Sequence, residues 1–197
     1  EDGIYPKIYF GFTKYGYAWV FPKKNFATVG MGGLVAPNEQ GLRDRFRTFI
    51  GMVSDRELTS LRRIEGFPVP LHNFTKCPVR GNVFLVGDAA GFIEPITGEG
   101  IYFAILSGKL SAESVLSSGN TGDVYNRLLK ENVYPVLNQA YFVKRLYFNP
   151  RILLYAMNKM KRNGKYCKYY FQLLSGKIDY IGYVWRVLRD RAKYKSE

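Results

Sequence analysis

The stretch that most constrains the fold runs from Asn82 to Gly108, NVFLVGDAAGFIEPITGEGIYFAILSG. It begins with Val83–Val86, and short apolar, β-branched runs of this kind are typical of strands covered on both faces. A loop containing Pro95 follows, and Gly98–Gly100 then opens an expected helix. The positions expected to form its apolar side are Ile101, Ile105, Leu106, Leu110 and Val115. A strand that ends in a glycine-lined turn into a helix is where open α/β sheets bind ligands.

Asp88 stands at the end of this expected strand. An ionised carboxylate only accepts hydrogen bonds, so it suits the hydroxyls of a sugar or ribitol chain and repels phosphate. Gly98 and Gly100 lack a Cβ and let a flat ligand approach the backbone. The helix start offers unpaired N–H groups and about half a positive charge, which favours the negative part of a ligand. An ordinary strand-turn-helix corner with a capping aspartate would give the same pattern, and spacing alone leaves both interpretations open.

The run GDAAGFIEPITGEGIYFAILSG resembles the second FAD-binding motif of flavoproteins with the p-hydroxybenzoate hydroxylase-like fold, and is most similar to the geranylgeranyl reductase family. A second element, Tyr15–Lys23, resembles the family's G-Y-x-W-x-F-P-K strand, and Val29–Gly32 resembles the V-G-x-G strand that follows it. The resemblance implies FAD, with Asp88 holding the ribityl chain and Pro95–Ile101 lying along the isoalloxazine. The implied cofactor-binding residues are Gly87, Asp88, Ala89, Gly91, Pro95, Thr97, Gly98, Glu99, Gly100 and Ile101.

The activity that the resemblance implies is reduction of C=C bonds in isoprenoid chains, on ether lipids or on the chlorophyll side chain. Hydride would pass from reduced flavin to one alkene carbon and a proton to the other. The electron donor would be NAD(P)H or a ferredoxin-like protein, and the proton donor is not identified. Two alternatives stay open: a related flavin monooxygenase or halogenase, and a non-enzymatic basic module that binds membrane or nucleic acid.

The chain departs from the family pattern in one respect. Such flavoproteins begin with a strand and a G-x-G-x-x-G turn that cradles the FAD pyrophosphate. The nearest candidate, Gly30–Val35, places Val35 at the third glycine position, so we expect no phosphate cradle there. The sequence also starts at Glu1 without a methionine. We therefore expect the C-terminal part of a longer enzyme, inactive by itself.

The first part of the chain has the pattern of an antiparallel or mixed sheet. Ile8–Phe12, Tyr17–Phe21 and Phe26–Gly30 are rich in aromatic and β-branched residues, and Lys24-Asn25 suits a hairpin turn. Alternation places Tyr17, Trp19 and Phe21 on one face. This face either packs in a core or lines a cavity for a long apolar substrate, and the resemblance favours the cavity.

Helices are expected in the middle of the chain as well. Asn38 can cap a helix to about Val53, and a short helix is expected from Asp55 to Arg63. Gly66–Leu71 then suits an edge strand, because proline cannot sit in a central ladder. The predicted class is α+β, with a sheet-rich substrate-cavity portion at residues 1–81 that includes helix 38–53, an FAD-contacting strand-loop-helix at 82–120, and a helical region at 121–197.

The helical region should begin at Thr121 or Asp123 and break at Asn149-Pro150, Asn163-Gly164 and Ser175-Gly176. Residues 123–197 hold 16 Lys and Arg against 5 Asp and Glu, so most of the net charge of +13 lies there, among many aromatic residues. Three interpretations are open: a helical subdomain with a solvated basic face, attachment to an anionic membrane surface, or phosphate contacts with nucleic acid. No recognised nucleic-acid motif appears, and a polyprenyl lipid substrate favours membrane contact.

Other classes find little support in the sequence. His72 is the only histidine, which leaves no histidine-based metal cluster and little basis for a hydrolase triad. Cys77 and Cys167 lie far apart and form no disulfide or metal pattern, which fits a reducing compartment. No run of about 18 apolar residues occurs. We expect a cytoplasmic protein, peripheral at the membrane if the basic tail makes contact.

Overall fold

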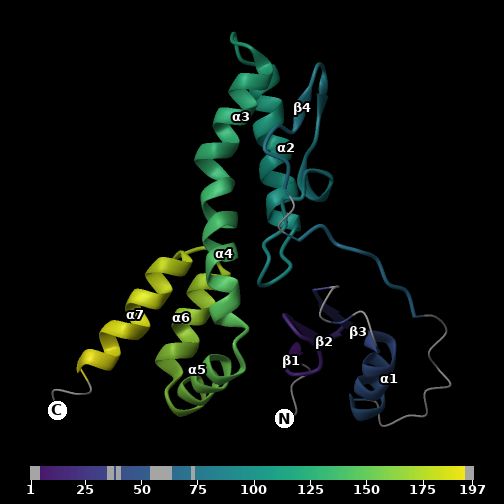
Figure 1. Ribbon diagram of the computed structural model, residues 1–197, viewed down its shortest axis with the longest axis vertical. Coiled ribbons are helices and arrows are strands. Elements are labelled where there is room, and N and C mark those ends of the chain that lie inside the picture. Colours follow the sequence, from purple (N-terminus) through teal and green to yellow (C-terminus); the bar gives the residue numbers. More distant parts are fainter. Residues whose placement is uncertain (1–4, 35–37, 39–40, 54–63, 72–73, 194–197) are drawn as a thin grey trace. The chain divides into compact units, whose positions relative to one another are not determined.

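The computed structural model describes residues 5–34, 38, 41–53, 64–71 and 74–193. The fold is α+β, as predicted, with two small antiparallel sheets and a helical C-terminal region (Figure 1). The chain divides into two units, Glu1–Phe67 and Pro68–Glu197, each with its own internal contacts. The three segments proposed from the sequence, with boundaries after residues 81 and 120, stay a prediction.

The first unit holds a three-stranded antiparallel sheet with the order β1-β2-β3. The strands are β1 (Lys7–Tyr9), β2 (Gly16–Pro22) and β3 (Ala27–Gly33). The hairpin expected around Lys24-Asn25 is confirmed, and the Lys23 amide donates a 2.7 Å hydrogen bond to the Phe26 carbonyl across the turn.

Tyr17, Trp19 and Phe21 lie along one face of β2, as alternation predicts. Their ring centroids are 5.8 Å apart for Tyr17 and Trp19 and 6.1 Å apart for Trp19 and Phe21. Trp19 pairs with Gly30 of β3, and a Cβ on Gly30 would come within 2.1 Å of the indole. This glycine therefore makes room for an aromatic ring, and β3 continues as a strand to Gly33.

Helix α1 (Leu42–Val53) ends where the sequence predicts, but the expectation that Asn38 caps it is wrong. Asn38 is 2% exposed, and its side chain accepts a 2.9 Å hydrogen bond from the Lys14 amide. It also donates to the carbonyls of Lys14 and Leu34 at 2.8 and 2.6 Å. A carboxamide both donates and accepts, so the buried Asn38 side chain can bond an amide and two carbonyls beside the sheet at the same time.

The buried side of α1 packs on aromatic rings of the same unit. Phe49 is fully buried, and its ring meets Tyr9 at 5.1 Å and Phe12 at 4.9 Å between centroids, both edge-on. The arginines of this helix are exposed, as predicted; they are Arg43, Arg45 and Arg47.

Two further expectations concern the segment after α1. The short helix from Asp55 to Arg63 lies outside the described residues. Gly66–Leu71, expected as an edge strand, belongs to no ladder, and Phe67 is 79% exposed. Pro68 and Pro70 have no N–H to donate, which weakens any pairing of this segment.

In the second unit, the apolar run Val83–Val86 forms less of a strand than predicted. β5 (Val83–Phe84) pairs with β4 (Val79–Arg80), and the described residues supply no other partner strand. Val83 is 63% exposed and Leu85 38% exposed, so the expectation of cover on both faces is wrong. With one neighbouring strand, only the alternate side chains pack on the core of this unit.

Most of the second unit is helical. Its helices are α2 (Ile101–Val115), α3 (Thr121–Asn132), α4 (Tyr134–Tyr147), α5 (Pro150–Arg162), α6 (Gly164–Leu174) and α7 (Tyr180–Lys193). No helix in the described part of the chain is both long and apolar enough to cross a membrane.

The predicted breaks at Asn149-Pro150, Asn163-Gly164 and Ser175-Gly176 are confirmed. Asparagine caps explain two of them: Asn149 accepts from the amides of Arg151 and Ile152, and Asn163 accepts from that of Lys165. Sequence reasoning missed a further break at Val133, which separates α3 from α4 and precedes a proline in the first turn of α4.

Candidate functional site

The proposed cofactor segment starts with a 3-10 helix, η3 (Gly87–Ala90), that leads from β5 into the loop. Gly87 has φ +51°, and a Cβ there would come within 2.8 Å of the Ala104 Cβ on α2. The Gly87 amide donates a 2.9 Å hydrogen bond to the Ser107 hydroxyl, which is fully buried on α2. Both the conformation and the close approach therefore require glycine at this position.

Asp88 and Gly100 form the centre of the site. The Asp88 side chain is exposed, and a Cβ on Gly100 would lie 2.9 Å from Asp88 Oδ1. Gly100 occupies the position just before α2, which begins at Ile101. The structure therefore brings the carboxylate and the helix start together, as the sequence predicts for a ligand corner.

The ten predicted cofactor-binding residues separate into two groups by exposure. One group is exposed or half-buried and can meet a ligand directly: Asp88, Ala89, Thr97, Gly98, Glu99, Gly100 and Ile101. The other group is buried and supports the loop from within: Gly87, Gly91 and Pro95. Direct contact with a cofactor stays a prediction, and burial restricts it to the residues of the first group.

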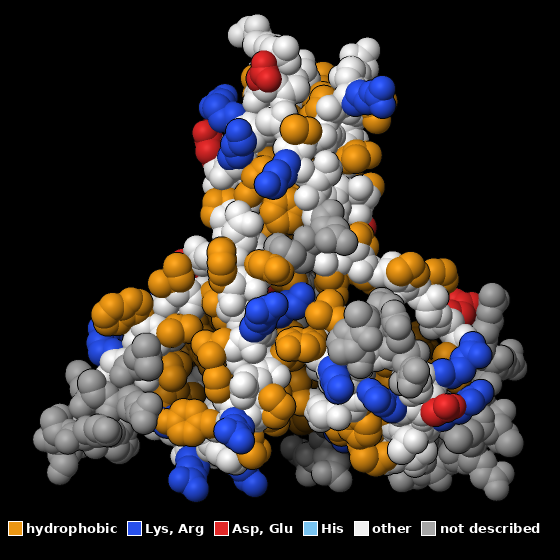
Figure 2. All heavy atoms as spheres, viewed as in Figure 1, with side chains coloured by type: hydrophobic (Ala, Val, Ile, Leu, Met, Phe, Trp, Pro, Cys, Tyr) orange, Lys and Arg blue, Asp and Glu red, His pale blue; other side chains and the backbone are white. Residues whose placement is uncertain are grey.

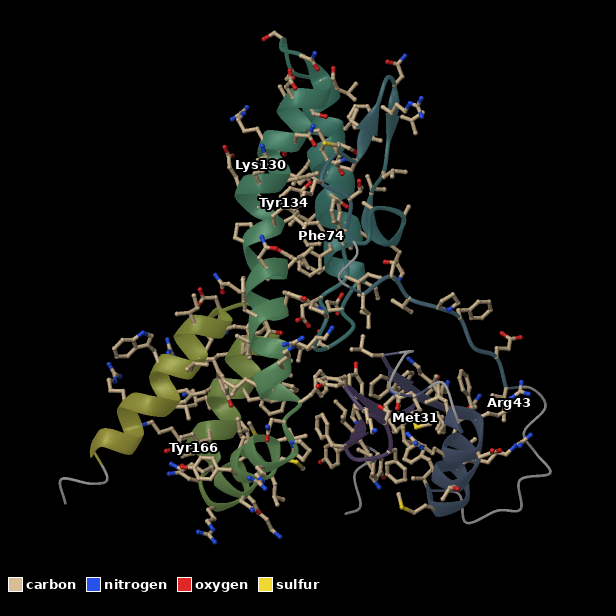
Figure 3. The ribbon with its side chains drawn as sticks, viewed as in Figure 1. Met31, Arg43, Phe74, Lys130, Tyr134 and Tyr166 are labelled. Carbon is tan, nitrogen blue, oxygen red and sulfur yellow. The ribbon has the colours of Figure 1, made fainter. Side chains whose placement is uncertain are left out.

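The loop after η3 is anchored first by an aromatic side chain. Phe92 is fully buried in a core that includes Phe103, Leu129 and Leu137 from α2, α3 and α4. The Tyr134 ring lies 6.0 Å from Phe92 and stacks at 5.1 Å on Phe74. Figure 3 shows Phe74 and Tyr134 pointing toward each other.

Glu94 closes the middle of the loop. It is 5% exposed, and its carboxylate accepts hydrogen bonds from the Ile96 amide at 3.0 Å and the Thr97 amide at 2.6 Å. The Thr97 hydroxyl donates a third, 2.5 Å from the same carboxylate. The backbone adds two more bonds, from the Glu94 amide to the Glu99 carbonyl and from the Gly98 amide to the Glu94 carbonyl, both 2.9 Å. The loop is thus a compact turn built around one buried carboxylate.

The start of α2 already holds a negative charge. The Glu99 carboxylate accepts a 2.9 Å hydrogen bond from the Tyr102 amide in the first turn. One of the four amides that a helix start leaves unpaired is thereby used within the chain. The attraction of this helix start for an anion is weaker than the sequence alone suggests, and Asp88 adds a second carboxylate nearby.

The apolar stripe expected along α2 is wrong. Its buried positions are Phe103, Ser107, Leu110 and Ser114, spaced at helical intervals. Of the five residues expected to share one side, Leu110 is buried, whereas Ile101 is 75%, Ile105 70% and Val115 60% exposed. Small serines allow α2 to approach its neighbours closely, and the isoleucines are left as an exposed apolar strip that begins next to Gly100.

Four polar residues of this region were missed by sequence reasoning: Ser107, Glu94, Lys144 and Tyr180. Each is less than a tenth exposed. A serine in the middle of an apolar helix was the only available signal for Ser107, and nothing local distinguished Glu94 from an exposed loop carboxylate. The predicted substrate residues Tyr17, Trp19 and Phe21 belong to the first unit, so their role stays a prediction.

The fold that carries this site has a match among solved structures. The fold matches the crystal structure of a geranylgeranyl bacteriochlorophyll reductase-like protein from Thermoplasma acidophilum, with a TM-score of 0.60 and 27% sequence identity. The match covers 76% of this chain and 40% of that chain. No protein-family model matches the sequence.

Curated relatives carry names of the same kind. A chloroplastic geranylgeranyl diphosphate reductase of Oryza sativa subsp. japonica is 37% identical over 118 residues, which are 59% of this chain and 24% of the rice protein. A digeranylgeranylglycerophospholipid reductase of Methanococcus aeolicus is 30% identical over 146 residues, 66% of this chain and 36% of the relative. The chain is therefore a homologue of the geranylgeranyl reductases, and it spans a quarter to about a third of the length of these two relatives.

Proposed function

We propose that this chain provides the flavin-contacting loop of an FAD-dependent oxidoreductase that reduces C=C bonds of isoprenoid chains. One observation carries the proposal: the exposed Asp88 carboxylate lies beside the α-carbon of Gly100 at the start of α2, in a chain homologous to geranylgeranyl reductases. A buried ion pair does not suit an exposed carboxylate, and the side chain that accepts from the first turn of α2 is Glu99 rather than Asp88.

The residues present fit a flavin by shape and by donor type. Gly98 has φ +74° and is exposed, so a ring system can lie against its backbone. Asp88 accepts hydrogen bonds from ribityl hydroxyls, and Ile101 and Ile105 offer apolar surface along α2. When bound, FAD would supply the hydride for the alkene, which no side chain can provide.

The remaining parts of the proposal concern the substrate and its source. Tyr17, Trp19 and Phe21 present a continuous, half-buried aromatic face that suits an apolar polyprenyl chain. NAD(P)H or a ferredoxin-like protein would reduce the flavin. We place the enzyme in the cytoplasm, at the surface of a membrane that holds its lipid substrate.

Membrane contact is supported by the surface of the C-terminal helices. Helix α5 has no buried residue, and large apolar side chains are exposed on α5, α6 and α7. They include Leu154, Tyr155, Phe171, Ile181 and Trp185. Figure 2 shows Lys and Arg side chains interspersed with hydrophobic ones over this part of the molecule. Exposed aromatic rings with basic neighbours suit the headgroup region of an anionic bilayer.

The cofactor is tested by visible absorption of the natural polypeptide that carries this chain, beside the chain by itself, after addition of FAD and gel filtration. We expect retained flavin absorption in the natural polypeptide and at least a roughly tenfold loss of affinity in Asp88→Ala, since hydrogen bonds to a charged group are strong. Asp123→Asn, an exposed aspartate on α3, is the matched control and should retain flavin.

Two results would contradict this function. A polypeptide that stays colourless with FAD would remove the oxidoreductase proposal. Substrate-dependent hydroxylation with oxygen uptake would instead identify a flavin monooxygenase.

The membrane part is tested separately by sedimentation with vesicles that contain an anionic phospholipid. Binding should fall steeply with salt and weaken in Trp185→Ala, whereas binding to duplex DNA of equal or greater strength would contradict it.

A further inference from the structure

The proposed function gives no role to the buried carboxylate in the middle of the cofactor loop. A carboxylate has about four lone-pair sites, and the Ile96 amide, the Thr97 amide and the Thr97 hydroxyl occupy three of those on Glu94. A buried charge is costly unless it is paired and fully hydrogen-bonded. The partners outside the loop therefore decide whether this arrangement is stable.

Those partners come from the C-terminal helices. Tyr180 of α7, a residue only 7% exposed, lies near enough for its hydroxyl to interact with the Glu94 carboxylate. Lys144 of α4, also 7% exposed, lies near enough for its charge to interact with the same carboxylate. Burial, and to a lesser extent the charge of Glu94, raise the pKa of Tyr170 on α6. The Tyr170 hydroxyl lies 2.8 Å from that of Tyr147. Polar groups of three helices thus lie within range of electrostatic interaction with one loop carboxylate.

The neighbouring apolar side chain makes the same connection. Ile96 is 4% exposed and packs in a cluster with Ala140 of α4 and Tyr180 of α7. Leu173 of α6 borders this cluster. The loop is therefore joined to the C-terminal helices by both a polar and an apolar contact, two residues apart in sequence.

We propose that Glu94 is a positioning residue that ties residues 95–100 to α4 and α7, so that the C-terminal helices set the geometry with which this loop meets the flavin. The inference rests on the proposed function, because the loop matters for catalysis only if it contacts the cofactor. Glu94 itself is buried and touches neither flavin nor substrate in this scheme.

Tyr180 is suited to the task at neutral pH. Burial raises the pKa of its hydroxyl, and the charge of Glu94 and the hydrogen bond to it raise the pKa further. The hydroxyl therefore stays protonated and can donate to the carboxylate. Burial lowers the pKa of Lys144, and the charge of Glu94 opposes that effect.

The test compares two tyrosine variants on one helix, in the natural polypeptide that carries this chain. Tyr180→Phe removes the hydroxyl that lies near Glu94, and Tyr183→Phe removes a half-buried hydroxyl one turn away. Hydrogen exchange of the amides in residues 96–100 is measured without flavin. We expect Tyr180→Phe to speed exchange of the Ile96 and Thr97 amides about tenfold, with Tyr183→Phe near wild type.

A second measurement separates positioning from general stability. In the flavin-loaded protein, we expect Tyr180→Phe to weaken the preference for reduced over oxidised flavin about tenfold, which corresponds to a midpoint potential about 30 mV lower for a two-electron couple. Tyr183→Phe should leave the potential unchanged. Glu94→Gln keeps the size of the side chain but presents an NH₂ group to the loop donors. The backbone amides of Ile96 and Thr97 in this variant should therefore exchange at least as fast as in Tyr180→Phe.

Unchanged exchange in Tyr180→Phe or Glu94→Gln would overturn the proposal, and so would equal acceleration in Tyr180→Phe and Tyr183→Phe. Faster exchange with no change in potential would also overturn it, because Glu94 would then be a structural residue only. A protein that binds no flavin but shows the expected exchange pattern would sink the proposed function while confirming the link from Glu94 to α7.

Discussion

The loop from Gly91 to Gly100 is held by different means at its two ends. Its early end is anchored by Phe92, whose ring is enclosed by apolar and aromatic side chains of α2, α3 and α4. Its later part, from Glu94 onward and called the late end below, is held by hydrogen bonds from the Ile96 amide and from the amide and hydroxyl of Thr97 to the Glu94 carboxylate. Apolar burial supplies most of the stability of a fold, whereas hydrogen bonds contribute less net energy and fix geometry. The early end should therefore govern whether the unit folds, and the late end how the loop is shaped.

The largest expected effect is at the early end. Phe92→Ala should lower the free energy of unfolding by about 3–5 kcal/mol, because it removes a fully buried ring and leaves a cavity. Chemical denaturation followed by far-UV circular dichroism measures the loss. Phe171→Ala, at a ring that is 66% exposed, is the matched control and should change stability by less than about 0.5 kcal/mol. Equal losses in the two variants would refute the assignment of Phe92 as the apolar anchor.

The next effect concerns the entry into the loop. Gly87→Ala should cost roughly 2–3 kcal/mol, because a side chain at φ +51° is strained and its Cβ would meet Ala104. Gly108→Ala, on the same helix as Ala104 with nothing within 4 Å of its Cβ, should instead stabilise the protein by up to about 1 kcal/mol. Thermal unfolding of both variants checks the opposite signs. A neutral Gly87→Ala would show that η3 can move away from α2.

Tyr125, which packs in the same apolar core as Phe92, should make the stability of the protein depend on pH. Burial, and then the nearby Tyr134, raise the pKa of Tyr125 to about 12, and its hydroxyl donates a 3.0 Å hydrogen bond to the Leu85 carbonyl. Between pH 10 and 12 the folded state then holds a proton that the unfolded state has lost. The stability from this group is complete below pH 10 and falls as pH rises, by about 2 kcal/mol at pH 12.

Urea unfolding at pH 8 and pH 11 measures this dependence. Tyr125→Phe removes the titrating hydroxyl, so its stability should fall less between the two pH values than that of wild type. Tyr5→Phe, at a side chain that is 70% exposed, should follow wild type. A Tyr125→Phe protein that loses as much stability as wild type would show that other groups control the alkaline transition.

The same contrast between the two ends explains what the sequence could predict. Signals that act within a few residues were sufficient to predict local structure. Alternation placed Tyr17, Trp19 and Phe21 on one face, and asparagine caps located the breaks before α5 and α6. The resemblance identified the loop but could not separate exposed Asp88 from buried Gly87. The strand before Asp88 was overestimated, since an apolar run records propensity and not the number of partner strands. Glu94 and Tyr180 are 86 residues apart, and no local pattern relates them.

The smallest expected effect lies at the late end, where it tests the division between stability and geometry most directly. Thr97→Val keeps the shape of the side chain but removes the hydroxyl that donates to Glu94 and accepts from the Glu99 amide at 3.2 Å. The free energy of unfolding should fall by only about 1 kcal/mol. Exchange of the amides in residues 96–100 should nevertheless rise, whereas Phe92→Ala should speed exchange throughout the second unit. Thr97→Ser retains the hydroxyl and should behave as wild type in both measurements. If Thr97→Val costs as much stability as Phe92→Ala, or leaves the exchange rates of the loop amides unchanged, the late end does not act as a separate determinant of loop geometry.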